Sequence, residues 1–579
     1  MFKLLDKIPW DKIKKEILES TTRFPLSILC GIALAILYYL TIHKYYPWIE
    51  FEKYIFTLQI ALPIFISAQL IHETYFKEKK LLIYAVSVLL LLLYFFFIYN
   101  IEYKDWNYIK FLTILIVAHS SVSFVGFYKE KDNAGIYNFN LHLLQQVIIG
   151  GFYCACIVIG INGAILAIDT LFKGEFNHNI YIDTFIITLF LFHPIYFTSQ
   201  ISNFDELNQE EPQGNKFIEI LVKFLFIPFS IIYFLILYAY GIKLLIDWEL
   251  PIGWISKLCI GFSAIGIITY VLNTAYKNSK NNYHKNYSSY FFWSLIPVII
   301  LHFIGIFYRI DEYGFTEFRY IIALLAIGLS LLTIYFLRSK KLLIKTIPVL
   351  FSIMGLLIVI GPWNAHQISL YSQASRFENQ LLKQNLVVDS KIDISKLNMM
   401  DDSVKKELFD NLQFFISRKN TTKIDQFFPN ELVEKTIDYK YDYSSVHPYS
   451  KFVDSLGYHD SHLYNEQYVW INDEHYLNEI IELKSYSKCI PFDLEEQTTN
   501  EQINIKNKYL VYNKSDSIPV IDLLLSNNIN LEGSNTAKMK LKCNIQQTGA
   551  LLILKEISLK MHHAGDRKID HIVGLLFIE

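Results

Sequence analysis

The chain of 579 residues is rich in apolar side chains: hydrophobic residues make up 53%, aromatic residues 16% and charged residues only 19%, with a formal net charge of −2. Soluble proteins carry about 25% charged residues, and a near-neutral chain has no basic surface for nucleic acid, which excludes nucleic acid as a partner. Charge is also unevenly distributed, because residues 1–363 are 15% charged and residues 364–579 are 25% charged. The composition therefore predicts a membrane-embedded first part and a water-soluble second part.

The first predicted element is a basic amphipathic segment at residues 1–23. Its apolar residues include Trp10 and Ile13, and they alternate along the segment with lysines such as Lys12 and Lys15. This pattern favours a helix that lies in the cytoplasmic membrane interface. A plain basic flank that only orients the first span would carry the same charges, so both interpretations are kept.

Residues 24–363 predict an all-α polytopic membrane helix bundle. A spanning helix needs about 20 mostly apolar residues, because lipid cannot satisfy backbone polar groups and the helix must do so itself. Eleven segments meet this requirement, and they lie near residues 24–42, 54–71, 81–99, 109–127, 143–168, 181–199, 217–240, 252–272, 290–308, 320–337 and 342–360.

Lysine and arginine predict how this bundle is threaded. They concentrate in residues 3–23, 77–80, 277–285 and 338–345, and such clusters stay in the cytoplasm. The N-terminus is therefore expected inside, and an odd number of spans places the C-terminal part outside. These features predict a multi-pass membrane protein, with the lipid bilayer as its surroundings.

Side chains that anchoring does not require collect in the connections predicted to face outside. The set comprises Asp169, Lys243, Asp247, Trp248, Glu249, Arg309, Asp311, Glu312, Glu317, Arg319 and Trp363. In one interpretation they form a binding site, where arginines offer two parallel hydrogen bonds to a carboxylate or phosphate. In the other, Arg–Asp and Arg–Glu pairs lock short turns and the tryptophans mark the membrane interface.

Polar and small residues inside the spans are sparse. Small side chains at Gly150, Gly151, Gly160 and Gly163 favour close helix packing in the fifth span. His119, Asn162 and His302 could in principle serve a proton or solute path, but a lone histidine is more often a packing residue. No span shows the acidic pair or the broken helices expected of a coupled transporter.

Residues 364–579 predict a soluble α+β domain with an antiparallel sheet. Two helical patterns come first, at residues 364–390 and 401–419, and short strands separated by turn residues follow. Cys489 and Cys543 lie in this part and could pair in an oxidising compartment; two separate buried thiols are the alternative.

The group around His459 lies in a polar stretch, so we expect loop residues and no metal site.

Several strings resemble the bacterial membrane proteins catalogued as domain of unknown function 4153. They are RFPLSILCGIALAIL near the start, LYAYGIKLL with WELPIGWIS, YRIDEYGFTEFRY, and GPWNAHQIS followed by SQASR. The resemblance covers about residues 20–380 and implies a polytopic inner-membrane protein without assigned catalytic residues. The similar strings lie mainly at the predicted outer surface. One departure is Asn364, at a position where the family pattern implies serine.

The sequence carries no motif for phosphate-binding loops, zinc hydrolases or serine nucleophiles, so it predicts no cofactor and makes an enzyme the less favoured class. The leading hypothesis is an envelope protein that senses or binds a small-molecule ligand or an envelope protein at the outer charged residues and through the C-terminal domain. A transporter is the second hypothesis. The third is a transferase for lipid-linked substrates, which requires a groove beside Asp247, Glu249, Arg309 and Glu312.

Overall fold

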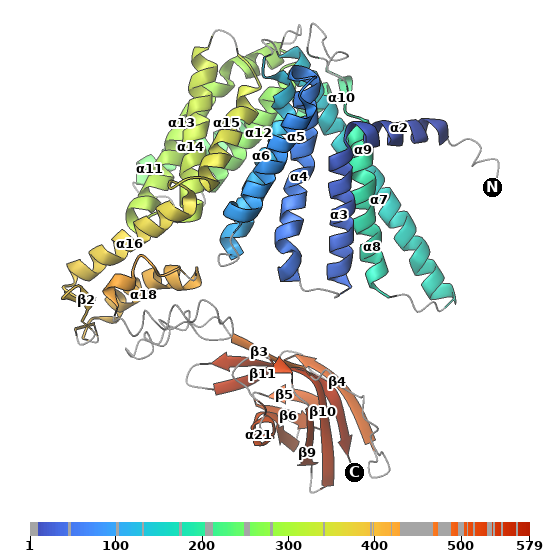
Figure 1. Cartoon of the computed structure of the whole chain (residues 1–579). Coiled ribbons are helices and arrows are strands. Elements are labelled where there is room, and N and C mark those ends of the chain that lie inside the picture. The colour runs from blue at the N-terminus through green and yellow to red at the C-terminus, as the bar shows by residue number, and fades with distance from the viewer. Residues whose placement is uncertain are drawn as a thin grey trace. The chain divides into compact units, whose positions relative to one another are not determined.

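The computed structural model divides the chain into two compact units, Met1–Gln373 and Ala374–Glu579, each considered separately below (Figure 1). The structure describes residues 10–43, 48–99, 104–129, 133–172, 177–202, 212, 214–247, 255–277, 282–339, 342–393, 396–397, 399–418, 420–428, 467–472, 488–495, 503–506, 508–512, 516–527, 529, 535–536, 539–545, 548–562 and 566–578.

The first unit is built of helices alone in its described residues. They are α2 (Trp10–Arg23), α3 (Pro25–Ile42), α4 (Trp48–Tyr75), α5 (Lys80–Leu93), η1 (Tyr94–Ile98), α6 (Lys104–Phe124), η2 (Val125–Phe127), α7 (Ala134–Phe172), α8 (Asn179–Ile187), η3 (Thr188–Phe192), α9 (His193–Ser199), α10 (Lys216–Leu221), η5 (Val222–Phe226), α11 (Ile227–Asp247), α12 (Ile255–Asn273), α13 (Asn282–Tyr313), α14 (Glu317–Arg338) and α15 (Thr346–Val359). The helix α16 (Ala365–Lys383) begins in this unit and continues into the second.

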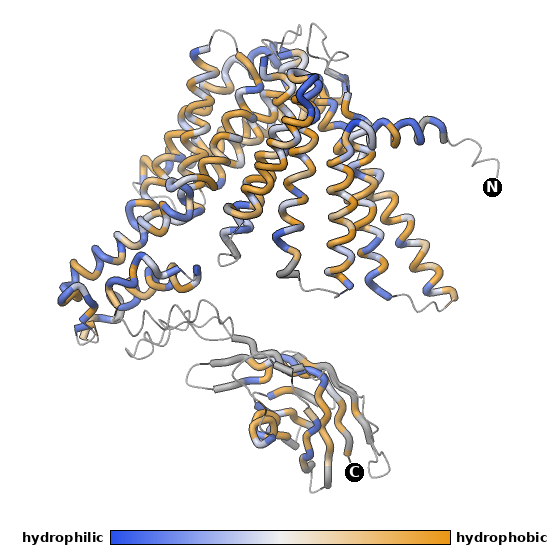
Figure 2. The backbone as a smooth tube through the Cα atoms, in the orientation of Figure 1, coloured by the Kyte–Doolittle hydropathy of each residue, from blue (hydrophilic) through white to orange (hydrophobic). Residues whose placement is uncertain are grey.

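Nine helical segments of the described chain are long and apolar enough to cross a membrane, and their apolar residues dominate the first unit in Figure 2. Nine of the eleven predicted spans correspond to these segments. The other two, at 81–99 and 342–360, form shorter apolar helices, Lys80–Phe96 and Thr346–Val359. The polytopic helical fold is therefore confirmed, with a lower count of full-length spans.

The shortness of α15 has a local cause. Its 14 residues cover about 21 Å at 1.5 Å per residue, which is less than the roughly 30 Å hydrocarbon layer. Pro348 lies in the first turn, where proline is tolerated because the helix needs no backbone N–H there. At the other end, Ile360 is extended and Gly361 has a φ of 89°, so the helix cannot continue.

The amphipathic segment α2 packs on α9 and projects sideways from the start of α3 (Figure 1). Arg23, the last residue of α2, donates two hydrogen bonds to the Glu73 carboxylate, from Nε to Oε1 at 2.8 Å and from Nη2 to Oε2 at 2.7 Å. Ser20 and Thr198 hydroxyls lie 2.6 Å apart in the same contact. The helix predicted from the first residues is therefore present from Trp10 onward.

Small residues permit close helix contacts at only some of the positions that the sequence suggested. A Cβ at Gly150 would come within 2.9 Å of the Tyr196 ring, but nothing lies within 4 Å of such an atom at Gly151, Gly160 or Gly163. Another glycine shows the closest approach, because a Cβ at Gly31 would collide with the Phe190 carbonyl oxygen. Close packing through glycine therefore involves helices other than α7 as well, with Gly31 on α3, Gly266 on α12 and Gly355 on α15.

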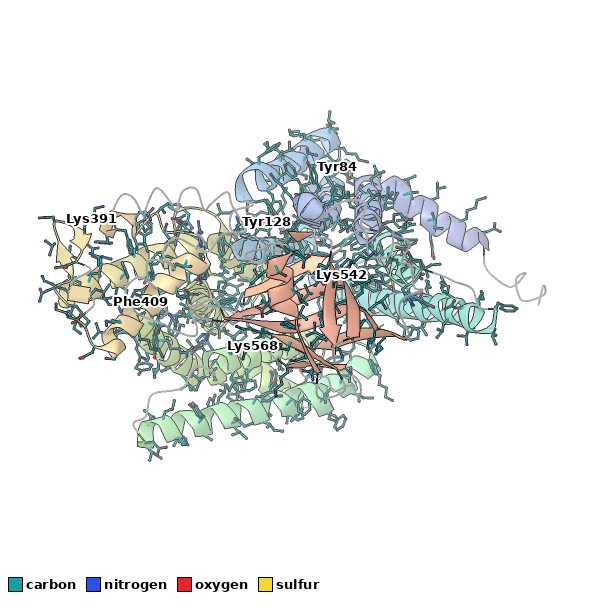
Figure 3. All side chains as sticks on the ribbon, turned by 90° about the horizontal axis from the view of Figure 1, so that it is seen from below. Tyr84, Tyr128, Lys391, Phe409, Lys542 and Lys568 are labelled. Carbon is teal, nitrogen blue, oxygen red and sulfur yellow. The ribbon has the colours of Figure 1, made fainter. Side chains whose placement is uncertain are left out.

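The second unit begins with the last part of α16 and with α18 (Asp402–Ser417). A short hairpin of β1 (Val387–Val388) and β2 (Lys391–Ile392) and the turn η6 (Asp425–Phe427) accompany them. Phe377 of α16 stacks on Phe428 with ring centroids 6.2 Å apart, and Arg376 pairs with Glu407 of α18 at 3.2 Å. Figure 3 marks this helical part by Lys391 and Phe409.

The remaining described residues of this unit form mainly antiparallel sheets, as predicted. Their members are β3 (Gln467–Asn472), β4 (Lys488–Glu495), β5 (Ile503–Lys506), β6 (Tyr509–Tyr512), β7 (Asp516–Pro519), β8 (Asn535–Thr536), β9 (Lys540–Ile545), β10 (Thr548–His562) and β11 (Asp566–Ile578), with the helix α21 (Val520–Ser526). The larger sheet has the order β4-β11-β10-β3-β8, with β9 also pairing with β10, and the smaller has the order β5-β6-β7.

The strand register places one face of the larger sheet in the core. Leu552 pairs with Leu541 on one side and Leu576 on the other, and Leu576 pairs with Ile490. All four side chains are buried, whereas Lys542, on the next residue of β9, is exposed; Lys542 and Lys568 mark this sheet in Figure 3. Successive side chains point to opposite faces of a strand, so Leu541 and Lys542 of β9 lie on opposite faces, whereas residues 550–554 of the central strand β10 are buried in succession.

The same register separates the two candidate disulfide cysteines. Cys489 of β4 pairs with Phe577, and Cys543 of β9 pairs with Ala550 on the far side of β10. Three strand spacings of about 4.8 Å each lie between them, beyond the 7 Å that a disulfide allows between Cα atoms. Cys543 is a free thiol, and burial raises its pKa to about 11. The structure therefore favours separate thiols over the disulfide.

Candidate functional site at the turn between α13 and α14

The predicted outer site centres on a tight turn between α13 and α14. The turn reverses the chain at Gly314, whose φ of 68° lies in the left-handed region that glycine adopts without strain. A Cβ at this position would also come within 2.8 Å of the Gln373 amide nitrogen and 3.1 Å of the Ser372 hydroxyl. Glycine is therefore required both by the backbone conformation and by the close approach of α16.

Side chains from α16 hold this turn. The Gln373 amide donates to the carbonyl oxygens of Tyr313 and Phe315, both at 2.8 Å, and the Phe315 backbone N–H donates to the Ser372 hydroxyl at 2.9 Å. Arg319 donates to the carbonyl oxygens of Gly314 and Tyr313 at 2.8 and 3.1 Å. We call the turn residues 313–319 with Ser372 and Gln373 the turn clamp; all of it lies within the first unit.

A buried acid–base pair lies directly beside the turn clamp. Oε1 of Glu317, in the first turn of α14, lies 3.1 Å from Nδ1 of His366, and each side chain is only 6% exposed. The His366 ring stacks on Trp106 of α6, with the centroids 5.6 Å apart. The first turn of a helix favours a carboxylate electrostatically, and the contact joins three helices at the same end of the bundle.

A second turn connects α15 to α16 beside this pair. Asn364 caps α16, because its Oδ1 accepts the Gln367 backbone N–H at 3.0 Å while its Nδ2 donates to the Gly361 carbonyl at 2.7 Å. Serine is also a strong helix N-cap, so the serine expected at this position and the asparagine present there could both cap α16. The departure at Asn364 therefore preserves the helix cap.

This cap yields a first testable expectation. Asn364→Ala should lower the free energy of unfolding by about 1 kcal/mol, and Asn364→Ser should stay within a few tenths of that of the unchanged protein. Thermal unfolding in detergent micelles measures both. Equal losses in the two variants would show that the cap does not support α16.

The structure brings some of the predicted site residues together and separates others. Arg309, Asp311 and Glu312 lie in the last turn and a half of α13, next to Glu317 and Arg319, and Trp363 lies in the neighbouring turn before α16. Lys243 and Asp247 lie on α11 and pair only weakly with each other at 4.0 Å, both well exposed. Asp169 lies in the last turn of α7, which packs on α8, η3 and α9 and diverges on the opposite side of the unit in Figure 1. Trp248 and Glu249 lie outside the described residues.

The charged residues differ in how far they are engaged within the chain. Arg319 and Glu317 are engaged within the chain, Arg319 with backbone carbonyls of the turn and Glu317 with His366. Asp311 and Glu312 are exposed, although the Glu312 carboxylate interacts with the hydroxyls of Tyr308 and Tyr313. Aromatic side chains add to this surface, with Phe318 67% and Trp363 51% exposed.

Sequence reasoning missed the partners that α16 contributes. His366, Ser372 and Gln373 lie in a polar segment that was considered only as part of a soluble helix, 49 to 60 residues from their partners along the chain. One signal pointed to them, because the family-like strings GPWNAHQIS and SQASR contain all three residues. In the described part of the chain, no group of three or more His, Cys, Asp or Glu side chains is arranged to hold a metal; His459 lies outside that part.

The fold defines a multi-pass helical membrane protein with a strand-rich C-terminal region. The family model described as domain of unknown function DUF4153 matches residues 26–397, and the chain belongs to this family. That match includes the turn clamp and all of α16, but ends before α18.

An uncharacterised protein of Pasteurella multocida (strain Pm70) is 26% identical over 407 residues, which cover 68% of this chain and 66% of that relative. The alignment thus spans just under two thirds of the relative's length. No solved structure matches the chain.

Proposed function

We propose that this protein is a non-enzymatic sensing or binding component of the bacterial inner membrane. In this proposal the turn clamp faces the extracytoplasmic side and presents residues 311–318 as a preformed surface for a ligand or an envelope protein. The exposed surface is acidic and aromatic, through Asp311, Glu312 and Phe318. It therefore suits a partner that carries cationic and apolar groups.

The observation that carries the proposal is the fixation of this turn by a third helix. Two membrane helices can be joined by a short turn without any help, yet here Ser372 and Gln373 satisfy its backbone and a buried Glu317–His366 pair fixes its start. Fixing a loop before binding lowers the ordering cost of association. A turn held in this way is the structural feature expected of a recognition surface.

Photocrosslinking in living cells tests the proposal. A photoreactive amino acid at Asp311 should form an adduct with a specific envelope component, and Gln373→Ala should strongly reduce it because the turn loses its fixed shape. The matched control position is Lys277, which is exposed in the connection between α12 and α13. Identical adducts at both positions, or an adduct unaffected by Gln373→Ala, would contradict the proposal.

A transporter would need a polar path, and the described structure does not place the candidate residues on one. The Asn162 amide donates to the Tyr181 carbonyl at 3.2 Å, and the His119 Nδ1 lies 2.9 Å from the Leu115 carbonyl oxygen of its own helix. His302 is fully buried in α13. The cavity considered below is lined by none of these three residues.

His302 separates the two functional hypotheses by experiment. Neither ring nitrogen has a hydrogen-bond partner among the described residues, and such buried polar atoms cost about 1–3 kcal/mol. His302→Leu should therefore raise the free energy of unfolding, as thermal unfolding in micelles would show, and leave the Asp311 adduct intact. If His302→Leu lowered the free energy of unfolding instead, the imidazole would have a polar role in the folded protein. The transporter hypothesis requires such a role.

A further inference from the structure

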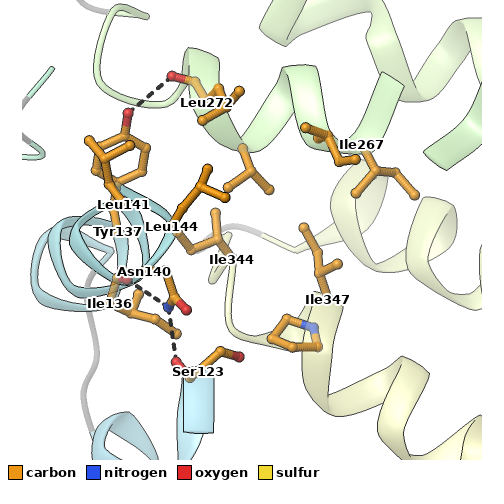
Figure 4. Close-up of a pocket in the computed structure, with 13 residues that line it drawn as sticks. Ser123, Ile136, Tyr137, Asn140, Leu141, Leu144, Ile267, Leu272, Ile344 and Ile347 are labelled. Carbon is orange, nitrogen blue, oxygen red and sulfur yellow. Dashed lines mark hydrogen bonds between the residues drawn. The ribbon is translucent and has the colours of Figure 1, made fainter. Parts of the chain in front are cut away.

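A cavity of about 270 Å³ lies in the first unit, at the opposite end of α15 from the turn clamp (Figure 4). Its walls come from the end of α6, the first turns of α7, the end of α12 and the start of α15. Most of the lining is aliphatic, as with Ile267, Leu272 and Ile347. The size lies near the lower limit of roughly 300 Å³ for small-molecule sites, so it holds one alkyl segment and not a two-chain lipid.

The cavity opens at the side of the bundle. Two of its lining residues are about half exposed, Leu144 of α7 at 47% and Ile268 of α12 at 52%. Both belong to helices that are long and apolar enough to cross a membrane, and the side of such a helix faces lipid chains. A hydrocarbon chain can therefore enter laterally from the bilayer.

One polar group gives the cavity chemical selectivity. The Asn140 amide nitrogen donates to the carbonyl oxygens of Ser123 at 2.9 Å and Ile136 at 2.8 Å. Because both contacts need a donor, they fix the amide orientation and leave Oδ1 as an acceptor. Figure 4 shows this oxygen on the cavity side. Two hydroxyls also belong to lining residues, and both already donate to backbone carbonyls, Tyr137 to Leu272 at 3.1 Å and Ser123 to Ser120 at 2.7 Å.

We propose that this cavity binds the alkyl chain of a single-chain membrane amphiphile whose head group donates a hydrogen bond from a hydroxyl to Asn140 Oδ1. The aliphatic walls take the chain, which gains free energy as its apolar surface is buried. The amide oxygen of Asn140 selects a head group with a donor over one without. The ligand therefore resembles a monoacylglycerol or another neutral lipid with one chain.

The probe is monolauroylglycerol that carries a diazirine in its chain, used on the full-length protein in micelles. Irradiation should label peptides containing residues 136–144 or 267–272, and mass spectrometry locates the label. The methyl ester of the same diazirine acid lacks the donor, and it should label about three- to tenfold less, as the loss of one hydrogen bond predicts.

Two variants and one control make the assignment specific. Val271→Phe fills the cavity and should abolish labelling of these peptides by monolauroylglycerol, whereas Ile148→Phe, on an exposed part of α7 outside the cavity lining, should not. Leu144→Trp blocks the opening and repeats the test if Val271→Phe does not fold. Asn140→Leu should retain labelling and remove the preference over the methyl ester.

Two results would overturn the proposal. Undiminished labelling in both Val271→Phe and Leu144→Trp would show that the probe binds the general lipid-facing surface. Equal labelling by monolauroylglycerol and its donor-free analogue in the unchanged protein would show that Asn140 selects nothing.

Discussion

Glu317→Ala is expected to lower the free energy of unfolding by about 1–3 kcal/mol, the usual cost of removing one partner of a hydrogen bond between two buried polar groups. The variant leaves the imidazole of His366, whose side chain is 6% exposed, without its carboxylate partner at 3.1 Å. Thermal unfolding of the purified protein in micelles measures the loss. The effect is large because the carboxylate and the imidazole are both removed from water, whereas surface pairs contribute about 0–1 kcal/mol.

The matched control is Glu312→Ala, since Glu312 lies five residues away on the exposed surface of the same region. It should change stability by less than about 0.5 kcal/mol. His366→Leu combined with Glu317→Ala should cost less than the two single changes added together, because residues in contact couple. Glu317→Ala within 0.5 kcal/mol of the unchanged protein would contradict the role of this pair.

Gly31→Ala is expected to lower the free energy of unfolding by about 2–3 kcal/mol. The added methyl group would collide with the backbone carbonyl of Phe190, and backbone atoms cannot move aside as a flexible side chain can, so the contact between α3 and η3 must open. The destabilisation should appear as a lower melting temperature in micelles and as a smaller yield of folded protein after purification.

Gly160→Ala is the matched control for this helix contact. Nothing lies within 4 Å of a Cβ at Gly160, and alanine favours a helix over glycine by about 1 kcal/mol, so this variant should be neutral or more stable. If Gly31→Ala were as stable as Gly160→Ala, the close approach of α3 to η3 would be disproved. If Gly160→Ala lowered the free energy of unfolding instead, α7 would pack at Gly160 against a partner that is not part of this chain.

Most of the membrane fold could be predicted from the sequence because lipid imposes one strong rule. A run of about 20 apolar residues must form a helix to satisfy its backbone, so run lengths located nine full-length spans. The rule does not set helix ends, which is why residues 342–360 were predicted as a full span although Pro348 and Gly361 restrict α15 to 14 residues.

Less of the site could be predicted, for two physical reasons. Alternation along the chain indicates which connections share an end of the bundle, but it does not order the helices sideways, so Asp169 was grouped with α13 residues from which the structure separates it. The contacts made by His366 and Gln373 depend on tertiary packing between segments far apart in sequence. No periodicity or local spacing reports such contacts.

The central claim is that the turn clamp faces outward as a recognition surface, and cysteine labelling tests this claim most directly. The protein would carry Asp311→Cys or Lys277→Cys in a background without its six native cysteines, and a membrane-impermeant maleimide would be added to intact spheroplasts. We predict labelling of Asp311→Cys before lysis and of Lys277→Cys only after it. Labelling of Lys277→Cys in intact spheroplasts, with Asp311→Cys protected until lysis, would contradict the account.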